Sequence, residues 1–546
     1  MKSMRLFARP ATLIAVMLLV GCETQPLLKG EGLASLTTPL GVPATVLAPE
    51  APLPPAPTRQ WADSTQDVDS YRVAGWGLVS IPTLQTYLNR LYAAVKATGG
   101  YPNWPGSVYI LADPALRATS TPAGNIFISL GWIRSIESED EIVALLSHEF
   151  SHVYLNHHAG TDVGNAAQTV SQLAAVAWMI ANRNVQATAM NGAYAVAGVQ
   201  TFGSGVAMPA WQRSQEEEAD RLGAAISLRS GYSYSQGFKL FLEHIDSYDT
   251  MQQAQDDALE QAGFDALRRA AGQAAAEQAR REQGNVKDVS GLGKASSDLQ
   301  VKLAESSTDV QSAFRRAIGQ FKAKVTDNHD SAASREDTLS KAIAPVLAGK
   351  PRPAQRAEAW KSALKQRDTA VLLNHYALFP AIDEAIAAKR LPEALQLANT
   401  AASGPTTNDA LPLYYLQTVT GLMQQGQMVS DLPRRHLRAP ERSWKLELLI
   451  ASSLAKRDRA VGKALIEEQF LYFHRAPPAW PELIAFYREN GFNTEAKTMA
   501  QECSAKLPAY RTACVQSAKT ESEQQADKAA AEREGKRLAD KLIKSR

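Results

Sequence analysis

Three residues within a run of five carry the clearest chemistry in this 546-residue chain. His148, Glu149 and His152 match the pattern H-E-x-x-H. Side chains four positions apart lie on the same face of a helix, so both imidazoles can bind one zinc ion. The glutamate beside them can act as a general base toward a water molecule that the zinc activates. The pattern therefore predicts zinc-dependent hydrolysis, with one Zn²⁺ per chain.

The residues around the motif predict the helix that it needs. Ser138 and Glu141 have the spacing of a capping box, and acidic residues occupy the first turn, where the helix dipole favours negative charge. Apolar residues then recur at the positions expected for a largely buried helix: Ile142, Val143, Leu145, Leu146, Phe150 and Val153. Buried histidine and glutamate side chains need polar partners, and a metal ion is the simplest partner.

Two histidines leave a zinc site incomplete, because catalytic zinc usually has three protein ligands and one open position. His158 has the metzincin spacing after His148, but that motif requires glycine where this chain has Leu155. Glu216 and Asp220 offer a second route, since they lie four residues apart on a predicted helix. We expect Glu216 to be the third ligand and Asp220 to hold a histidine ligand by hydrogen bonding. The alternative is an exposed acidic helix face.

The motif and its downstream partner resemble the gluzincin zinc metallopeptidases, the family that includes the prenyl-CAAX endopeptidases, HtpX and the BepA-like periplasmic members. The resemblance rests on residues 147–153 and on the Arg-Ser-x-Glu-x-Glu-Ala-Asp run at 213–220, and it covers about residues 70–225. It implies a protease in which Glu149 is the general base. It also implies that His157 corresponds to a family histidine that is not a ligand.

The resemblance further implies a strand beside the substrate. Residues 122–131 are similar to the Pro-Gly-Gly-x-Ile edge strand of the family, which makes Ile126–Ser129 the expected edge. Exposed strands of a protein substrate could add to this edge by β-augmentation. Residues 117–120 depart from the Asn-Ala-Phe-Ala-like run of relatives, so the resemblance does not extend to the detailed shape of the substrate edge, although it still covers the zinc site.

A second match to BepA-like members lies far downstream. His329 is followed six residues later by Arg335, the spacing found in relatives. By resemblance, His329 is a candidate inhibitory fourth zinc ligand or a transition-state contact, together with Arg335. The proline that follows the histidine in relatives is missing, and the segment lies further from Glu216 than it does there. A solvated loop histidine is the alternative.

The N-terminus predicts export. Lys2, Arg5 and Arg9 precede the apolar run 11–20, the pattern of a signal peptide, and the run is short for a membrane span. It ends at Cys22 in a sequence that resembles a bacterial lipobox. The resemblance implies cleavage before Cys22 and acylation of that cysteine. We therefore expect an outer-membrane lipoprotein of the bacterial envelope that faces the periplasm, with membrane contact through lipidated Cys22.

Cysteine usage agrees with an oxidising compartment. The chain has 3 cysteines, and assignment of Cys22 to lipid leaves Cys503 and Cys514. An even pair predicts a disulfide, with two free thiols as the alternative.

The C-terminal third predicts a helical repeat domain. Trp480, Leu483 and Tyr487 have the spacing of a tetratricopeptide (TPR) unit, with weaker echoes at 391–405 and 413–426. At least three such units are needed to bury a continuous core. A concave surface for an envelope assembly-machinery partner is the functional interpretation, and a generic helical domain is the alternative. A net charge of +2 without a basic aromatic patch gives no indication of nucleic-acid binding.

These observations predict a mostly α-helical fold with a small β-sheet: an α+β zincin-type protease domain followed by a TPR-like solenoid. The expected segments are a signal peptide (1–21), a Pro/Ala-rich tether (22–65), the protease core (66–246), a helical insertion and return segment carrying His329 (247–345), the TPR-like domain (346–519) and a charged tail (520–546). The expected function is a zinc endopeptidase that acts on misfolded or stalled envelope proteins. The alternative is an envelope chaperone or scaffold that works through the TPR-like domain.

Overall fold

The computed structural model describes residues 41–159, 213–250, 331–424, 427–520, 522–523 and 526. Cys22 and His329 lie outside the described residues, as do the predicted signal peptide and most of the predicted insertion and tail. The roles predicted for Cys22 and His329 therefore stay predictions.

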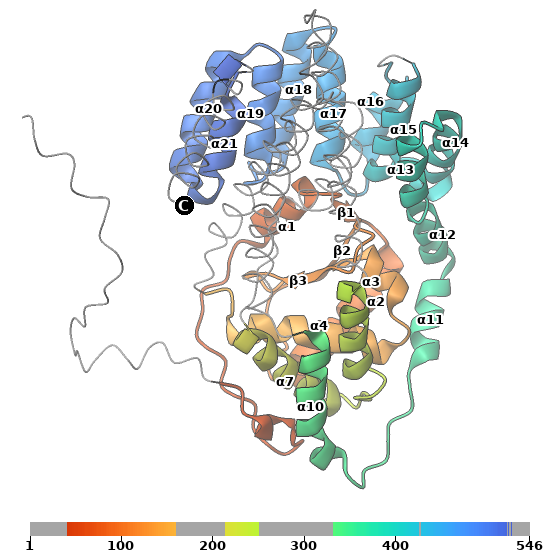
Figure 1. Cartoon of the computed structure of the whole chain (residues 1–546), viewed down its shortest axis with the longest axis vertical. Coiled ribbons are helices and arrows are strands. Elements are labelled where there is room, and N and C mark those ends of the chain that lie inside the picture. The colour runs from red at the N-terminus through yellow and green to blue at the C-terminus, as the bar shows by residue number, and fades with distance from the viewer. Residues whose placement is uncertain are drawn as a thin grey trace, which may run out of the picture. The chain divides into compact units, whose positions relative to one another are not determined.

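Helices dominate the N-terminal part, with four short strands between them (Figure 1). In chain order the elements are η1 (Ala44–Leu47), α1 (Ser64–Val73), β1 (Leu78–Val79), α2 (Pro82–Thr98), β2 (Val108–Leu111), β3 (Ala118–Ser120), β4 (Ile126–Ser129), α3 (Leu130–Ser135), α4 (Glu139–Leu155), α7 (Arg213–Arg229) and α10 (Ala332–Leu347).

After α10, the regular elements of the described residues are all helices (Figure 1). They are α11 (Ala357–Lys365), α12 (Arg367–Tyr376), α13 (Phe379–Ala387), α14 (Leu391–Ala401), η2 (Gly404–Thr406), α15 (Ala410–Met423), α16 (Leu432–Arg435), η3 (His436–Arg438), α17 (Trp444–Ala455), α18 (Arg459–Tyr472), α19 (Ala479–Glu489), α20 (Asn493–Lys506), η4 (Pro508–Tyr510) and α21 (Arg511–Ala518). The predicted fold class, mostly α-helical with a small sheet and a helical C-terminal part, is confirmed.

The sheet corrects one prediction about the substrate edge. Among the described strands the order is β1-β2-β4-β3, so β4 lies between β2, to which it is parallel, and β3, to which it is antiparallel. Ile126–Ser129 was expected to be the edge, and that prediction is wrong. All four residues of β4 are buried, which is typical of an apolar strand paired on both sides. Strand β3 forms the edge instead.

Helix α4 forms where the sequence predicts it. The side chain of Ser138 accepts a hydrogen bond from the backbone N–H of Glu141 at 3.3 Å. The Glu141 carboxylate accepts one from the backbone N–H of Glu137 at 3.0 Å, one residue earlier than in a standard capping box. Every residue from Glu139 to Tyr154 is buried. The helix ends because Asn156 adopts the left-handed conformation, with φ 57°.

The segment before α1 differs from the extended tether predicted for residues 22–65. Val42, Val46 and Leu47 are almost completely buried in the core that includes α4 and α7. The guanidinium of Arg229 on α7 donates to the backbone carbonyls of Val46, Ala48 and Ala51 at 3.0, 3.1 and 2.6 Å. A Pro/Ala-rich run forms few hydrogen bonds of its own, so its carbonyls remain available to Arg229.

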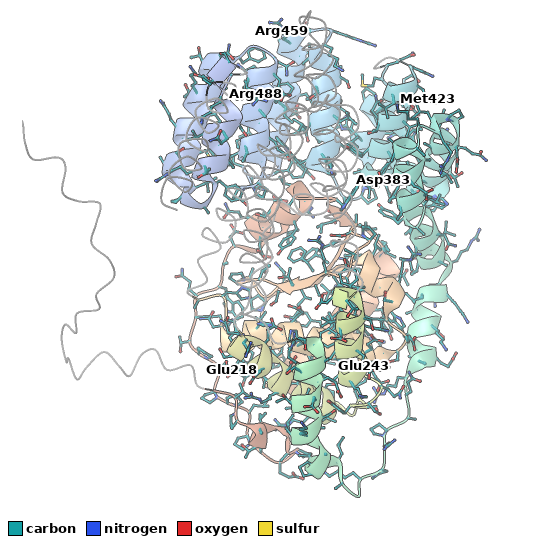
Figure 2. The ribbon with its side chains drawn as sticks, in the orientation of Figure 1. Glu218, Glu243, Asp383, Met423, Arg459 and Arg488 are labelled. Carbon is teal, nitrogen blue, oxygen red and sulfur yellow. A yellow bond between two sulfur atoms is a disulfide. The ribbon has the colours of Figure 1, made fainter. Side chains whose placement is uncertain are left out.

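Helices that follow one another in the C-terminal part pack together, as in α13 with α14, α17 with α18 and α19 with α20. The predicted repeat unit forms the pair α19 and α20: Trp480, Leu483 and Tyr487 are buried on the first helix, and Ala496 and Ala500 on the second. Met423, Arg459 and Arg488 mark this region in Figure 2. Assignment to the TPR class stays a prediction.

The predicted disulfide is present between Cys503 on α20 and Cys514 on α21.

At the start of the C-terminal helical part, α11 packs against α2 and α4, and the indole N–H of Trp360 donates to the carbonyl of Ile136 at 2.8 Å. The helical part therefore begins in contact with the helix that carries the H-E-x-x-H motif. Within the described ranges, none of the helices combines the length and apolar character that a membrane span requires.

Candidate metal centre

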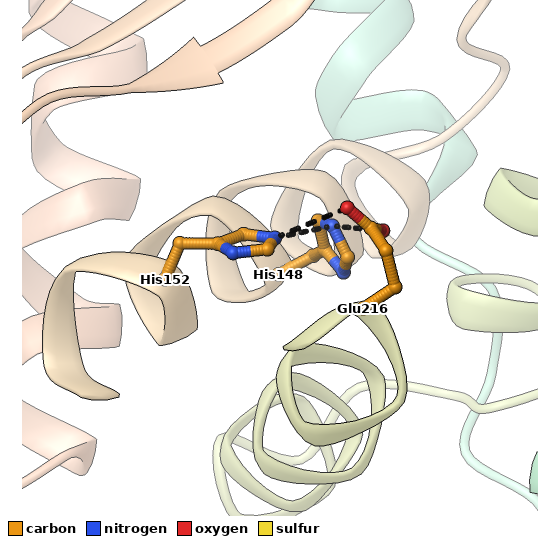
Figure 3. A group of neighbouring side chains, drawn as sticks. All are labelled: His148, His152 and Glu216. Carbon is orange, nitrogen blue, oxygen red and sulfur yellow. Dashed lines mark hydrogen bonds and ion pairs between the residues drawn. The ribbon is translucent and has the colours of Figure 1, made fainter. Parts of the chain in front are cut away.

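Two packed helices bring the predicted ligands together. His148 and His152 lie on one face of α4, and both imidazoles turn toward the Glu216 carboxylate on α7 (Figure 3). The two Nε2 atoms lie 3.2 Å apart. Nε2 of His148 lies 3.5 Å from one oxygen of Glu216, and Nε2 of His152 lies 3.8 Å from the other. One ligand atom from each of the three residues therefore lies within 4.8 Å of the other two.

This donor set fits a zinc ion. With bonds of about 2.0–2.1 Å, neighbouring ligand atoms of a tetrahedral zinc site lie roughly 3.3 Å apart. The two Nε2 atoms in this protein lie 3.2 Å apart, and each lies 3.5 or 3.8 Å from its nearer oxygen of Glu216, distances close to that value. Two imidazoles and one carboxylate are a ligand combination that zinc hydrolases use, and all three residues are buried. The fold therefore assembles His148, His152 and Glu216 into a group that could hold zinc.

Arg335 on α10 binds two carboxylates of α7, those of Glu216 and Asp220. Its guanidinium donates two hydrogen bonds to Asp220, both at 2.8 Å, and lies 2.9 Å from Glu216. Asp220 in turn lies 3.0 Å from Nδ1 of His148. Although burial raises the pKa of Asp220, Arg335 and His148 lower it well below its ordinary value. Arg335 therefore keeps Asp220 ionised and oriented toward His148.

The two histidines have opposite electrostatic surroundings. Burial lowers the pKa of His148, but the carboxylates of Asp220 and Glu216 outweigh burial and raise it overall. Burial lowers the pKa of His152 well below its ordinary value, and the nearby histidines add to the effect. His152 is therefore held neutral, which is the form of imidazole that binds metal.

Glu149 lies on α4 beside β3. It is buried, and burial raises its pKa to about 7, while the positive charge of His148 and the neighbouring Ser120 oppose the rise. Within the described residues, its Oε2 atom accepts no hydrogen bond. A carboxylate with an unused oxygen and a pKa near neutrality has the properties that a general base needs.

Two residues of the centre were not predicted as part of it. Nδ1 of His157 lies 2.9 Å from Nδ1 of His152, and Nε2 of His157 lies 3.2 Å from Glu218 on α7. The sequence indicated His157 only as a family match and Glu218 only as part of an acidic run. Periodicity could not find Glu218, since it lies on a different face of α7 from Glu216. His158 is not among the clustered ligand atoms.

Gly223 permits the close approach of α7 to α4. A Cβ atom at this position would lie 2.9 Å from the backbone nitrogen of His148, 3.0 Å from its Cα and 2.8 Å from the ring of Phe238. We expect Gly223→Ala to push the helices apart, cost roughly 1–3 kcal/mol of stability and move Glu216 relative to the histidines. Zinc affinity, measured by competition with a chelator, should fall. An unchanged affinity would show that α7 reaches the site without this contact.

Comparison with known proteins agrees with this geometry. Residues 82–333 match the model of peptidase family M48. The beta-barrel assembly-enhancing proteases of Yersinia pestis and Escherichia coli (strain K12) are 25% identical to this chain over 170 and 171 residues, which is 31% of this chain and 34% of theirs. A putative beta-barrel assembly-enhancing protease of Vibrio cholerae is 23% identical over 171 residues. The similarity thus spans about a third of each relative. Residues 82–333, a little under half of the chain, are therefore similar to peptidase family M48.

Proposed function

We propose that this protein is a zinc metalloendopeptidase. The observation that carries the proposal is the buried group of His148, His152 and Glu216 with Glu149 one residue from a ligand. These residues supply three ligands and one general base, which are the protein groups that zinc-dependent peptide hydrolysis requires. The match to peptidase family M48 supports the same chemistry.

The chain's own residues have separate tasks in this reaction. Zinc, when bound, would polarise the peptide carbonyl and lower the pKa of the attacking water. Oε2 of Glu149 accepts the proton of that water, and the same carboxyl group then delivers a proton to the departing amine. Asp220 orients the His148 ring, and Arg335 keeps Asp220 ionised. The buried surroundings limit access of bulk water to these groups.

The edge strand β3 is the element along which we place the substrate. It is an edge strand of the described sheet, where it pairs with β4, and it packs against α4. Ser120, the last residue of β3, neighbours Glu149. A peptide that lies along β3 would therefore bring its backbone carbonyl close to the general base. β-Augmentation of this kind favours extended segments of unfolded proteins.

The cellular role is inferred from the names of the relatives and from the N-terminal sequence. Relatives are named beta-barrel assembly-enhancing proteases, which suggests protein substrates of the bacterial envelope. We propose that this protein degrades misfolded or stalled outer-membrane and periplasmic proteins, is attached to the outer membrane through Cys22, and contacts the assembly machinery through its C-terminal helices. The same proposal includes inhibition of the enzyme by His329 as a fourth zinc ligand.

Removal of the metal tests the proposed function directly. The purified protein should contain about one zinc per chain, since the described part of the chain holds one such ligand group. Chelation should abolish cleavage of casein, and one equivalent of Zn²⁺ should restore it. Casein suits the test because it is largely unfolded. Cleavage that persists after chelation would exclude zinc as the catalyst, and a protein with neither zinc nor cleavage would favour a scaffold role.

A further inference from the structure

We propose that His157 and Glu218 are positioning residues that hold His152 in the orientation and tautomer needed to bind zinc. The inference rests on the proposed zinc site. Neither residue supplies a ligand atom to the group of His148, His152 and Glu216. Both are buried, so they are placed to act on His152 without contact with solvent.

The contacts form a continuous series from the metal centre through His157 to the carboxylate of Glu218. Nε2 of His152 faces His148 and Glu216, while its Nδ1 lies 2.9 Å from Nδ1 of His157. Nε2 of His157 lies 3.2 Å from an oxygen of Glu218. Each imidazole therefore uses both of its ring nitrogens, one toward the metal centre and one away from it.

The chemistry of imidazole determines where the ring protons of His152 and His157 lie in this series of contacts. When bound, a metal would take the lone pair on Nε2 of His152, which would leave the proton of that ring on Nδ1. That N–H donates to Nδ1 of His157, which must therefore be unprotonated. The proton of neutral His157 then lies on Nε2 and donates to Glu218. All three groups are satisfied by a single arrangement, in which the Glu218 carboxylate makes His157 a better acceptor and His152 a more basic ligand.

The two zinc-binding histidines are thus held by different means. His148 lies 3.0 Å from a carboxylate, Asp220, which Arg335 neutralises. His152 reaches its carboxylate only through a second imidazole. His157 follows the left-handed turn at Asn156, and Glu218 lies on α7 (Figure 2). These contacts consequently link the end of α4 to α7, and the same contacts orient His152.

Zinc affinity is the measurement that tests this proposal. His157→Phe keeps a planar ring but removes the hydrogen bonds to His152 and Glu218, and Glu218→Gln keeps the acceptor oxygen but removes the charge. We expect the zinc dissociation constant, measured by competition with a chelator, to rise roughly 10–100-fold for His157→Phe. Glu218→Gln should raise it less. The visible spectrum of the cobalt-substituted protein should change in His157→Phe, because the ligand geometry changes.

Glu217→Gln is the matched control, because it removes the same charge one residue away. Glu217 pairs with Arg221 on the outer side of α7 and is partly exposed. This variant should keep the zinc affinity and the cobalt spectrum of the unaltered protein. In the double variant His157→Phe/Glu218→Gln, the two effects should be less than additive, because removal of His157 disconnects Glu218 from the metal centre.

The possible failures are distinguishable. Absence of zinc from the unaltered protein would overturn the proposed function and this inference together. Zinc in the unaltered protein, with the same affinity and cobalt spectrum in Glu218→Gln and His157→Phe, would overturn the inference alone. If His157→Phe does not fold, Glu218→Gln decides, since it preserves the shape of the side chain. A purely structural role would lower the stability of the metal-free protein in both variants and leave zinc affinity unchanged.

Discussion

Replacement of Glu149 by glutamine should leave zinc bound and reduce peptide cleavage by roughly 10²–10⁴-fold. Glutamine has nearly the same shape as glutamate, but its amide cannot take a proton from water. Glu149 supplies no atom to the ligand group, so the metal site should survive the change. The fold should survive as well, because burial already raises the pKa of this carboxyl to about 7 and an uncharged side chain suits such a position.

The measurement pairs zinc content with the rate of casein cleavage. Glu137→Gln is a suitable control, since Glu137 is an exposed residue just before α4. It should retain both zinc and activity. If Glu149→Gln cleaved casein as fast as the unaltered protein, another base would have to be sought. If it lost zinc as well as activity, the separation between ligand and base roles would be wrong.

The second large effect concerns Arg335, and it should be greatest when the metal is absent. The Arg335 side chain is only 9% exposed and binds the buried carboxylates of Asp220 and Glu216. In Arg335→Met these carboxylates lose their positive partner. Loss of one member of a buried ion pair typically costs about 3–5 kcal/mol, because an uncompensated charge stays in the interior. We expect a loss of this size in the metal-free protein.

Zinc should recover part of that loss, since it supplies positive charge to the same carboxylates. The free energy of unfolding, measured in urea with and without Zn²⁺, should therefore show a larger zinc-induced increase for Arg335→Met than for the unaltered protein. Arg390→Met provides the control, because the ion pairs of Arg390 with Glu384 and Glu393 are exposed and should matter little. Equal stability of Arg335→Met and the unaltered protein without metal would contradict the proposed role of Arg335.

Local sequence patterns predicted the helix that carries the chemistry, and contacts across the fold decided its surroundings. Ser138, Glu141 and the apolar positions of α4 act within a few turns, so they can be recognised in one segment. The position of β4 could not be recognised this way. Its apolar run is compatible with an edge or a centre, and only the pairing with β2 and β3 on its two sides settles the question.

The burial of Val42, Val46 and Leu47 within residues 42–61 illustrates the same limit. Their composition is typical of a tether, and nothing within the segment indicates that Arg229 binds its carbonyls. The partner lies far away in sequence. Composition describes what a segment can do alone, whereas burial depends on which surface the rest of the chain presents to it.

The sequence alone was enough to predict the candidate metal ligands, because H-E-x-x-H and the Glu216–Asp220 spacing each depend on one helical turn. The tertiary structure alone decided how these pieces meet. Contact between α4 and α7 at Gly223, the ion pairs of Arg335 and the link from His152 through His157 to Glu218 all join residues far apart in the chain. Such contacts depend on how helices pack, and helix packing is not encoded in the periodicity of any one segment.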